Sequence, residues 1–103
     1  MEPILIFKAL SNEKRLMILE WLKDPEQHFV HQQHLSESDH FDGGVCVGSI
    51  RDKAELVQSV ISSYLNMMQN AGLLETKRIG KWTYYRRNEK VIKEFSEYIQ
   101  KDL

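Results

Sequence analysis

Apolar residues recur at spacings of three and four along much of the chain, and this period predicts amphipathic helices. The first helix follows Pro3 and ends near Ser11, and the second starts after Asn12, a residue type that caps helix N-termini. The second carries so many apolar residues that we expect it to be buried on most sides. A third helix is expected over 56–71, and a last helix follows a similar cap at Asn88.

A different pattern separates the last two helices. Two runs rich in β-branched and aromatic residues, 74–78 and 81–85, flank a short turn and predict a β-hairpin with Gly80 at its tip. Further upstream, a β-prone run over 45–47 precedes a short helix that Ser49 can cap. The hairpin, the short strand and the helices together indicate a mainly α fold with a small β element.

Length and composition fit a single domain over 1–103. The chain has 103 residues, of which 42% are hydrophobic and 28% charged, an ordinary balance for a globular protein. A core of this size is thin, so self-association is a common remedy. The apolar stripes of the first and last helices are therefore predicted to form a homodimer interface, made of Ile4, Leu5, Phe7, Val91, Ile92, Phe95 and Ile99.

Membrane and secretory classes do not fit the sequence. The longest uncharged stretch, 56–74, contains too many serine, glutamine and asparagine residues for a lipid-facing helix. Glutamates at positions 2, 13 and 20 argue against a secretory signal, so we expect no membrane association and a cytoplasmic location. Cys46 is the only cysteine, which excludes an intramolecular disulfide.

Charge is distributed unevenly although the net charge is only −1. Residues 1–44 hold 4 basic and 8 acidic side chains, whereas residues 45–103 hold 10 basic and 7 acidic ones. The cations concentrate in 76–87, where they alternate with aromatic residues and no acid intervenes. Two interpretations are open for this patch: a solvated hairpin whose cationic side chains cover its aromatics, or a surface that binds phosphates.

The order of the predicted elements is that of a winged helix-turn-helix domain, in which a short helix, a second helix and a basic hairpin follow one another. The helix over 56–71 has an uncharged polar face, and hydroxyl and amide groups of this kind can bond base edges in a major groove. The alternative for its serines is that small side chains allow close helix packing. The element order favours DNA contact.

Stretches within this order resemble the ArsR-type family of winged-helix transcriptional repressors. Residues 7–19 are similar to the family's opening F-x-A-L-[SA]-[DN]-x-x-R-L-x-I-L pattern, 58–65 to its Q-S-T-V-S-x-H-L recognition helix, and 78–85 to its R-x-G-[RK]-x-x-x-Y wing. Tyr64 replaces the usual histidine, so either its hydroxyl contacts the duplex or its ring has joined the core. The resemblance implies a homodimer that contacts an inverted repeat in double-stranded DNA through Gln58, Ser59, Ser62, Ser63, Tyr64, Lys77, Arg78, Lys81 and Arg86.

The resemblance also bears on what the protein senses. Many relatives release DNA when a metal binds a C-V-C motif, but the corresponding stretch here, 46–48, has one sulfur. Others bind metal on the last helix, which here lacks histidine. We therefore expect no metal site of either type and no cofactor, and any small-molecule effector stays open. Cys46 is either a thiol sensor or, as we expect, a buried structural residue.

Every histidine falls in the segment 24–44, whose pattern is otherwise the hardest to interpret beyond one helical turn after Pro25. At helical spacing, neighbouring imidazoles could bind zinc or nickel, whereas the simpler interpretation is a polar surface loop. Without a supporting motif we expect no ordered metal site. The residues concerned are His28, His31, His34 and His40.

These observations predict a sequence-specific DNA-binding transcriptional repressor without enzyme activity. The main alternative is a winged-helix protein-interaction module that uses the uncharged helix as a docking surface. A small hydrolase is disfavoured because no nucleophile motif accompanies the histidines. The residues themselves do not distinguish a repressor from an activator, and the repressor expectation comes from the resemblance.

Overall fold

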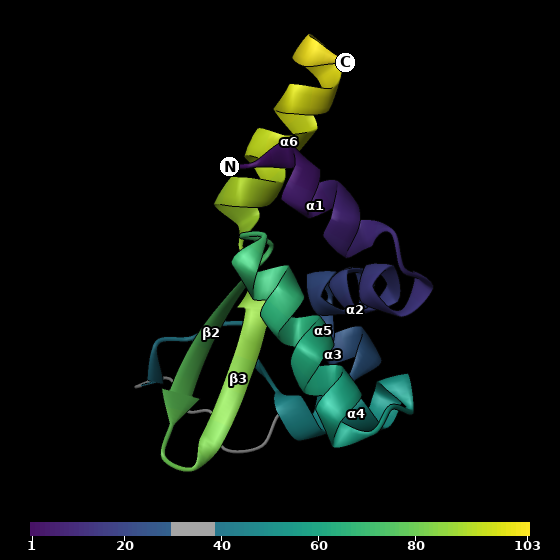
Figure 1. Cartoon of the computed structure of the whole chain (residues 1–103). Coiled ribbons are helices and arrows are strands. Elements are labelled where there is room, and N and C mark those ends of the chain that lie inside the picture. Colours follow the sequence, from purple (N-terminus) through teal and green to yellow (C-terminus); the bar gives the residue numbers. More distant parts are fainter. Residues whose placement is uncertain (30–38) are drawn as a thin grey trace.

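The computed structural model describes residues 1–29 and 39–103, shown in Figure 1. In chain order the elements are α1 (Pro3–Leu10), α2 (Glu13–Lys23), α3 (Pro25–His28), β1 (Val45–Cys46), α4 (Val47–Ala54), α5 (Gln58–Asn70), β2 (Leu74–Ile79), β3 (Trp82–Arg87) and α6 (Glu89–Asp102). Helices α2, α4 and α5 lie along one side of a small antiparallel sheet, and the last helix rises away from the rest of the molecule.

Local signals in the sequence determine where the main helices begin and end. The side chain of Asn12 accepts a hydrogen bond from the Arg15 amide at 3.0 Å, and that of Asn88 accepts one from the Val91 amide at 3.2 Å. Both predicted caps are confirmed. Helix α5 ends before Gly72, whose φ of +87° lies in the left-handed region that glycine adopts most readily.

The predicted hairpin is confirmed, with a small change in its register. Strand β3 lies between β1 and β2, and Ile79 pairs with Trp82, so the turn consists of Gly80 and Lys81. The second strand therefore runs over Trp82–Arg87 instead of 81–85. Two-residue turns favour glycine with a positive φ, and Gly80 has a φ of +62°.

The short β1 strand is smaller than predicted. Only Val45 and Cys46 pair with β3, opposite Tyr85 and Tyr84 respectively. Helix α4 already starts at Val47, two residues before the predicted cap at Ser49, and no side chain caps it. The strand therefore ends at Cys46 and α4 starts at the next residue.

The core forms where α2, α4 and α5 pack on one face of the sheet and α1 packs on α2 and α5. Helix α2 is covered on most sides, as predicted: Arg15, Ile18, Leu19 and Leu22 are buried, and Lys14, Met17 and Trp21 are half-buried. Its exposed residues form one narrow stripe, which includes Leu16 with 41% exposure. The side chains with no more than 1% exposure are Ile6, Ala9, Ile18, Val45, Ile50, Ala54, Ile61, Leu65, Met68, Leu73 and Tyr84.

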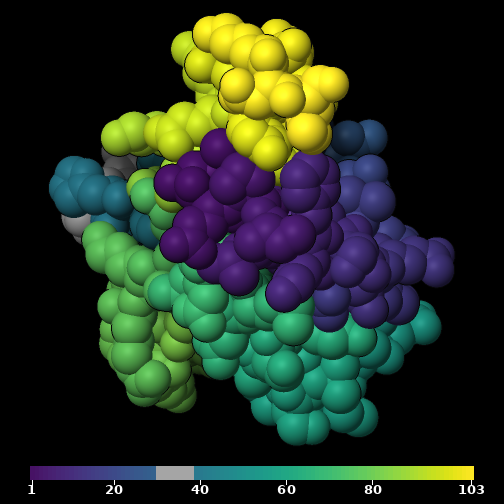
Figure 2. All heavy atoms as spheres, turned by 45° about the horizontal axis from the view of Figure 1, so that its top comes forward, coloured from purple at the N-terminus to yellow at the C-terminus, as the bar shows by residue number. Residues whose placement is uncertain are grey.

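Helix α6 has an apolar stripe but no buried residue. Its Phe95 meets Phe7 of α1 edge to face, with ring centroids 5.2 Å apart, and Figure 2 shows the two helices side by side on one face of the molecule. We call the apolar residues left exposed there the α1/α6 surface: Ile4, Leu5, Phe7, Ile99 and Leu103. None of the helices in residues 1–29 and 39–103 is long and apolar enough to cross a membrane.

Candidate nucleic-acid interface

Helix α5 separates an apolar face from a polar one. Ile61, Leu65 and Met68 enter the core, which holds the helix against α4 and α1. The helix begins at Gln58 instead of the predicted 56, after a left-handed residue at Glu55 has turned the chain. Gln58, Ser59 and Ser63 are exposed and Ser62 is half-buried, so the structure brings these predicted residues together on the solvent side.

A residue that sequence reasoning missed lies beside this face. Arg51 on α4 donates from Nη1 to Oε1 of Gln58 at 3.0 Å, and Nε2 of Gln58 donates to Oγ of Ser62 at 3.0 Å. The Nε of Arg51 also donates to Oδ1 of Asp52 at 3.2 Å. The only sign of this contact in the sequence is a cation seven positions before the start of α5. Whether that cation reaches Gln58 depends on the angle between α4 and α5.

Tyr64 points away from the polar face. Its hydroxyl accepts a hydrogen bond from Nδ2 of Asn12 at 3.3 Å, and the Arg15 guanidinium lies 4.8 Å from the ring centroid. Arg15 is itself buried and donates from Nε to the Ala9 carbonyl at 2.7 Å. Tyr64 is half-buried and packs against the start of α2, but its ring does not join the hydrophobic core as the second interpretation had it.

The tip of the hairpin carries the exposed cations of the wing. Arg78 and Lys81 are both exposed, and Nε of Arg78 donates to the Gly80 carbonyl at 3.3 Å. The Lys81 ammonium lies 5.3 Å from the centroid of Trp82. Both side chains remain accessible to an anion in solution.

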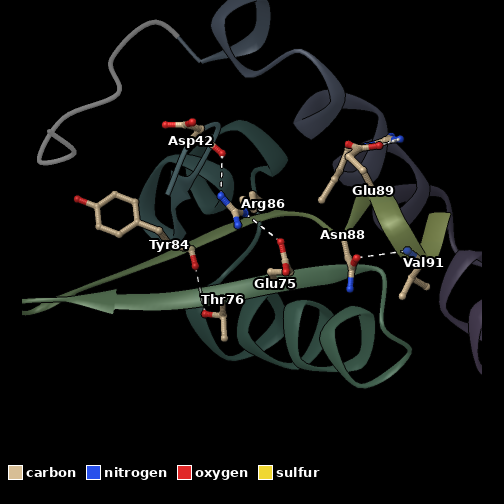
Figure 3. A network of polar contacts seen from close by, with 9 residues as sticks. Asp42, Glu75, Thr76, Tyr84, Arg86, Asn88, Glu89 and Val91 are labelled. Carbon is tan, nitrogen blue, oxygen red and sulfur yellow. Dashed lines mark hydrogen bonds and ion pairs between the residues drawn. The ribbon is translucent and has the colours of Figure 1, made fainter. Parts of the chain in front are cut away.

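The other two predicted wing residues lie on the outer face of the sheet. Because side chains alternate along a strand, Lys77 and Arg86 share a face with Glu75 and lie opposite Arg78. Arg86 forms an ion pair with Glu75 at 2.9 Å and donates to the Asp42 carbonyl at 3.4 Å (Figure 3). Its guanidinium also lies 4.3 Å from the ring centroid of Phe41. The structure therefore separates this pair from the tip of the wing.

Lys77 makes a comparable contact to the same segment, since its Nζ donates to the carbonyl of Asp39. The segment around residues 39–42 thus lies against the outer face of the sheet through two cations. Tyr84 is buried on the same face, and this burial raises the pKa of its phenol, with smaller contributions from Cys46 and Asp39. These contacts stabilise the wing instead of extending its charged tip.

Cys46 is half-buried instead of fully buried as expected, and its Sγ lies 3.1 Å from Oγ of Ser49. Its place at the strand end, where the chain turns into α4, explains the partial exposure. Within residues 1–29 and 39–103, no group of three or more histidine, cysteine or acidic side chains could hold a metal ion. His28 ends α3 and His40 has a positive φ, whereas His31 and His34 lie outside the described residues.

No protein-family model matches the chain. YbzH, an HTH-type transcriptional regulator of Bacillus subtilis, is 46% identical over 103 residues, which is the full length of both chains. The solved structure of Mb0332 from Mycobacterium bovis, described as a homodimeric winged helix-turn-helix DNA-binding domain and a possible ArsR-family regulator, matches with a TM-score of 0.64. It is 26% identical and the match covers 90% of this chain and 70% of that one. The chain belongs to the ArsR-type family of winged helix-turn-helix transcriptional regulators.

A further similar protein is HlyU from Vibrio cholerae, whose structure matches with a TM-score of 0.64 and 25% identity over 93% of this chain and 85% of that one. Its curated description is that of a transcriptional activator. The comparisons confirm the predicted fold class and a DNA-binding regulatory function. For this ArsR-type regulator, α4 and α5 are then the helix-turn-helix unit, and β2 and β3 are the wing.

Proposed function

We propose that this chain is a homodimeric transcriptional repressor that reads an inverted-repeat operator through α5. The observation that carries the proposal is the exposed polar face of α5, which lies in the same domain as the two exposed cations at the tip of the wing. Hydroxyl and amide side chains discriminate base edges, whereas cations bind phosphates regardless of sequence.

Fewer residues are proposed to contact DNA than were predicted from the sequence. Gln58, Ser59, Ser62 and Ser63 would contact base edges, and Arg78 and Lys81 would contact the DNA backbone. Three predicted residues would stabilise the fold around the interface without contacting DNA, because each already has a partner within the domain: Tyr64, Lys77 and Arg86.

The α1/α6 surface supports the dimer. Ile4 is 61% exposed, Phe7 40% and Ile99 43%, although all three are apolar and belong to adjoining helices. A contiguous apolar surface of this kind favours association, and a twofold axis would use the same surface on both protomers. The two α5 helices would then face two half-sites of opposite orientation, separated by about one turn of DNA, roughly 34 Å.

Repression would follow from occupancy. A dimer bound across two successive half-sites would exclude RNA polymerase from an overlapping promoter by competition, which requires no additional contact with the polymerase. A single-round transcription assay on a promoter that contains the selected operator tests this directly. A repressor lowers the amount of transcript as protein is added, and an increase in transcript would instead indicate an activator, as HlyU is named.

Selection of binding sites from a randomised duplex library tests the DNA-binding part. The full chain should enrich an inverted repeat, and Gln58→Ala and Ser62→Ala should weaken binding to it. Gln27→Ala is the matched control, because Gln27 is equally exposed on α3 and distant in sequence from α5. If neither α5 variant changes DNA affinity, the polar face serves another purpose, and the protein-interaction module becomes the better account.

A further inference from the structure

The polar face of α5 begins with three side chains joined in a row by hydrogen bonds. Arg51 donates to Gln58, and Gln58 donates to Ser62, with both donor-to-acceptor distances at 3.0 Å. Asp52 accepts from Nε of Arg51 at 3.2 Å and so holds the guanidinium from the α4 side. The Arg51 side chain is 38% exposed and Gln58 is exposed, so the row lies at the surface.

The direction of the row follows from the chemistry of arginine. A guanidinium has donors only, so the Gln58 atom that faces it must be the carbonyl oxygen Oε1. The amide nitrogen Nε2 is then turned toward Ser62, whose oxygen accepts its hydrogen. Arg51 therefore selects one of the two orientations of the amide, which Ser62 alone would not do because a hydroxyl both donates and accepts.

What the row can still offer to a ligand is a set of donors. Nε2 of Gln58 keeps one hydrogen, the Ser62 hydroxyl keeps its own, and the guanidinium keeps those that neither Gln58 nor Asp52 uses. An unrestrained glutamine pairs with adenine by turning Oε1 and Nε2 together toward the base, but here Oε1 is held toward Arg51 and Nε2 toward Ser62. Guanine presents two acceptors, N7 and O6, to the major groove and matches a row of donors.

We propose that Arg51 determines base specificity, by holding the Gln58 amide as a donor toward guanine and preventing its pairing with adenine. This inference rests on the proposed function, since it requires that α5 reads base edges. It adds a residue from the neighbouring helix to the recognition surface and assigns a base to that surface. A simpler role for Arg51, as a phosphate contact, would affect all DNA sequences alike.

The experiment compares the full-length protein with Arg51→Met, Gln58→Glu and a control variant in selections from the same randomised duplex library. The control is Lys53→Met, which removes an equal charge from the same helix. The Lys53 ammonium lies 5.1 Å from the centroid of Trp21, and neither of the side-chain hydrogen bonds described above for Gln58 involves Lys53. The quantity measured is the ratio of guanine to adenine at each operator position.

The wild type should prefer guanine at one position of each half-site. Arg51→Met should lower the guanine-to-adenine ratio there by at least about fivefold, the lower limit for a discriminating base-edge contact, because the freed Gln58 amide can turn and pair with adenine. Gln58→Glu should also lose the guanine preference, because a carboxylate keeps the Arg51 partner but has no hydrogen to donate. Lys53→Met should leave the ratio unchanged, even where it weakens overall affinity.

Equal guanine-to-adenine ratios for Arg51→Met and Lys53→Met would overturn the inference and leave Arg51 as a charge near the duplex, with the proposed function intact. A wild type that enriches no sequence at all would overturn the proposed function itself, and the inference with it. Circular dichroism of each variant shows that it has folded, and because Arg51 and Gln58 both lie at the surface, we expect native spectra.

Discussion

Truncating Ile4 should weaken the dimer without unfolding the protomer. Ile4 belongs to the α1/α6 surface and is 61% exposed. Full burial of an isoleucine side chain contributes about 1.5–3 kcal/mol, so covering the exposed part contributes about 1–2 kcal/mol per protomer. A twofold-symmetric interface contains the contact twice. Ile4→Ala should therefore weaken dimerisation by about 2–4 kcal/mol, roughly 30-fold to 700-fold in Kd.

Sedimentation equilibrium over a series of protein concentrations measures this change. Leu16→Ala is the matched control, because Leu16 is 41% exposed on α2 and lies outside the α1/α6 surface. It should leave the dimer Kd unchanged within a few fold. The reasoning is refuted if Ile4→Ala dimerises as strongly as the wild type, or if Leu16→Ala weakens the dimer equally.

Further substitutions test the interior and the wing. Arg15→Met should lower the free energy of unfolding by about 2–4 kcal/mol in urea titrations, because the buried guanidinium bonds the Ala9 carbonyl, whereas Lys23→Met on the exposed side of α2 should change it little. Burial raises the pKa of Tyr84 above the ordinary tyrosine value of 10.0. The folded state therefore favours the protonated phenol, and this contribution to stability is fully present below about pH 10 and is lost as the pH rises through the raised pKa. Tyr84→Phe should flatten that alkaline loss in unfolding curves, and an unchanged slope would contradict the assignment. Arg78→Met should lower the slope of log binding constant against log salt concentration by about one, the amount expected for one phosphate contact. Arg86→Met should lower the free energy of unfolding and leave that slope unchanged.

Local signals in the sequence were sufficient for the parts of the fold that depend on near neighbours. Asn12 and Asn88 cap their helices through contacts three residues away, and Gly72 and Gly80 adopt the backbone angles that glycine permits. These features require no knowledge of distant elements. The helical period of 56–71 likewise predicted which side of α5 enters the core, although not that the helix starts at Gln58.

Contacts between elements could not be predicted from the sequence. Lys77 and Arg86 lie in one basic stretch with Arg78, but the strand register places both of them on the face of the sheet opposite to Arg78. Arg51 was missed because its hydrogen bond to Gln58 depends on how α4 crosses α5, and no short-range sequence pattern encodes that crossing. The burial of Arg15 has the same origin, since its carbonyl partners belong to the preceding helix.

The most direct test of the central claim is an anisotropy titration of a labelled duplex that carries the selected operator, at two salt concentrations and against a scrambled duplex. The account predicts tight and selective binding by two protomers per duplex, with an affinity that falls steeply as salt is raised. Equal and weak binding to both duplexes would contradict it.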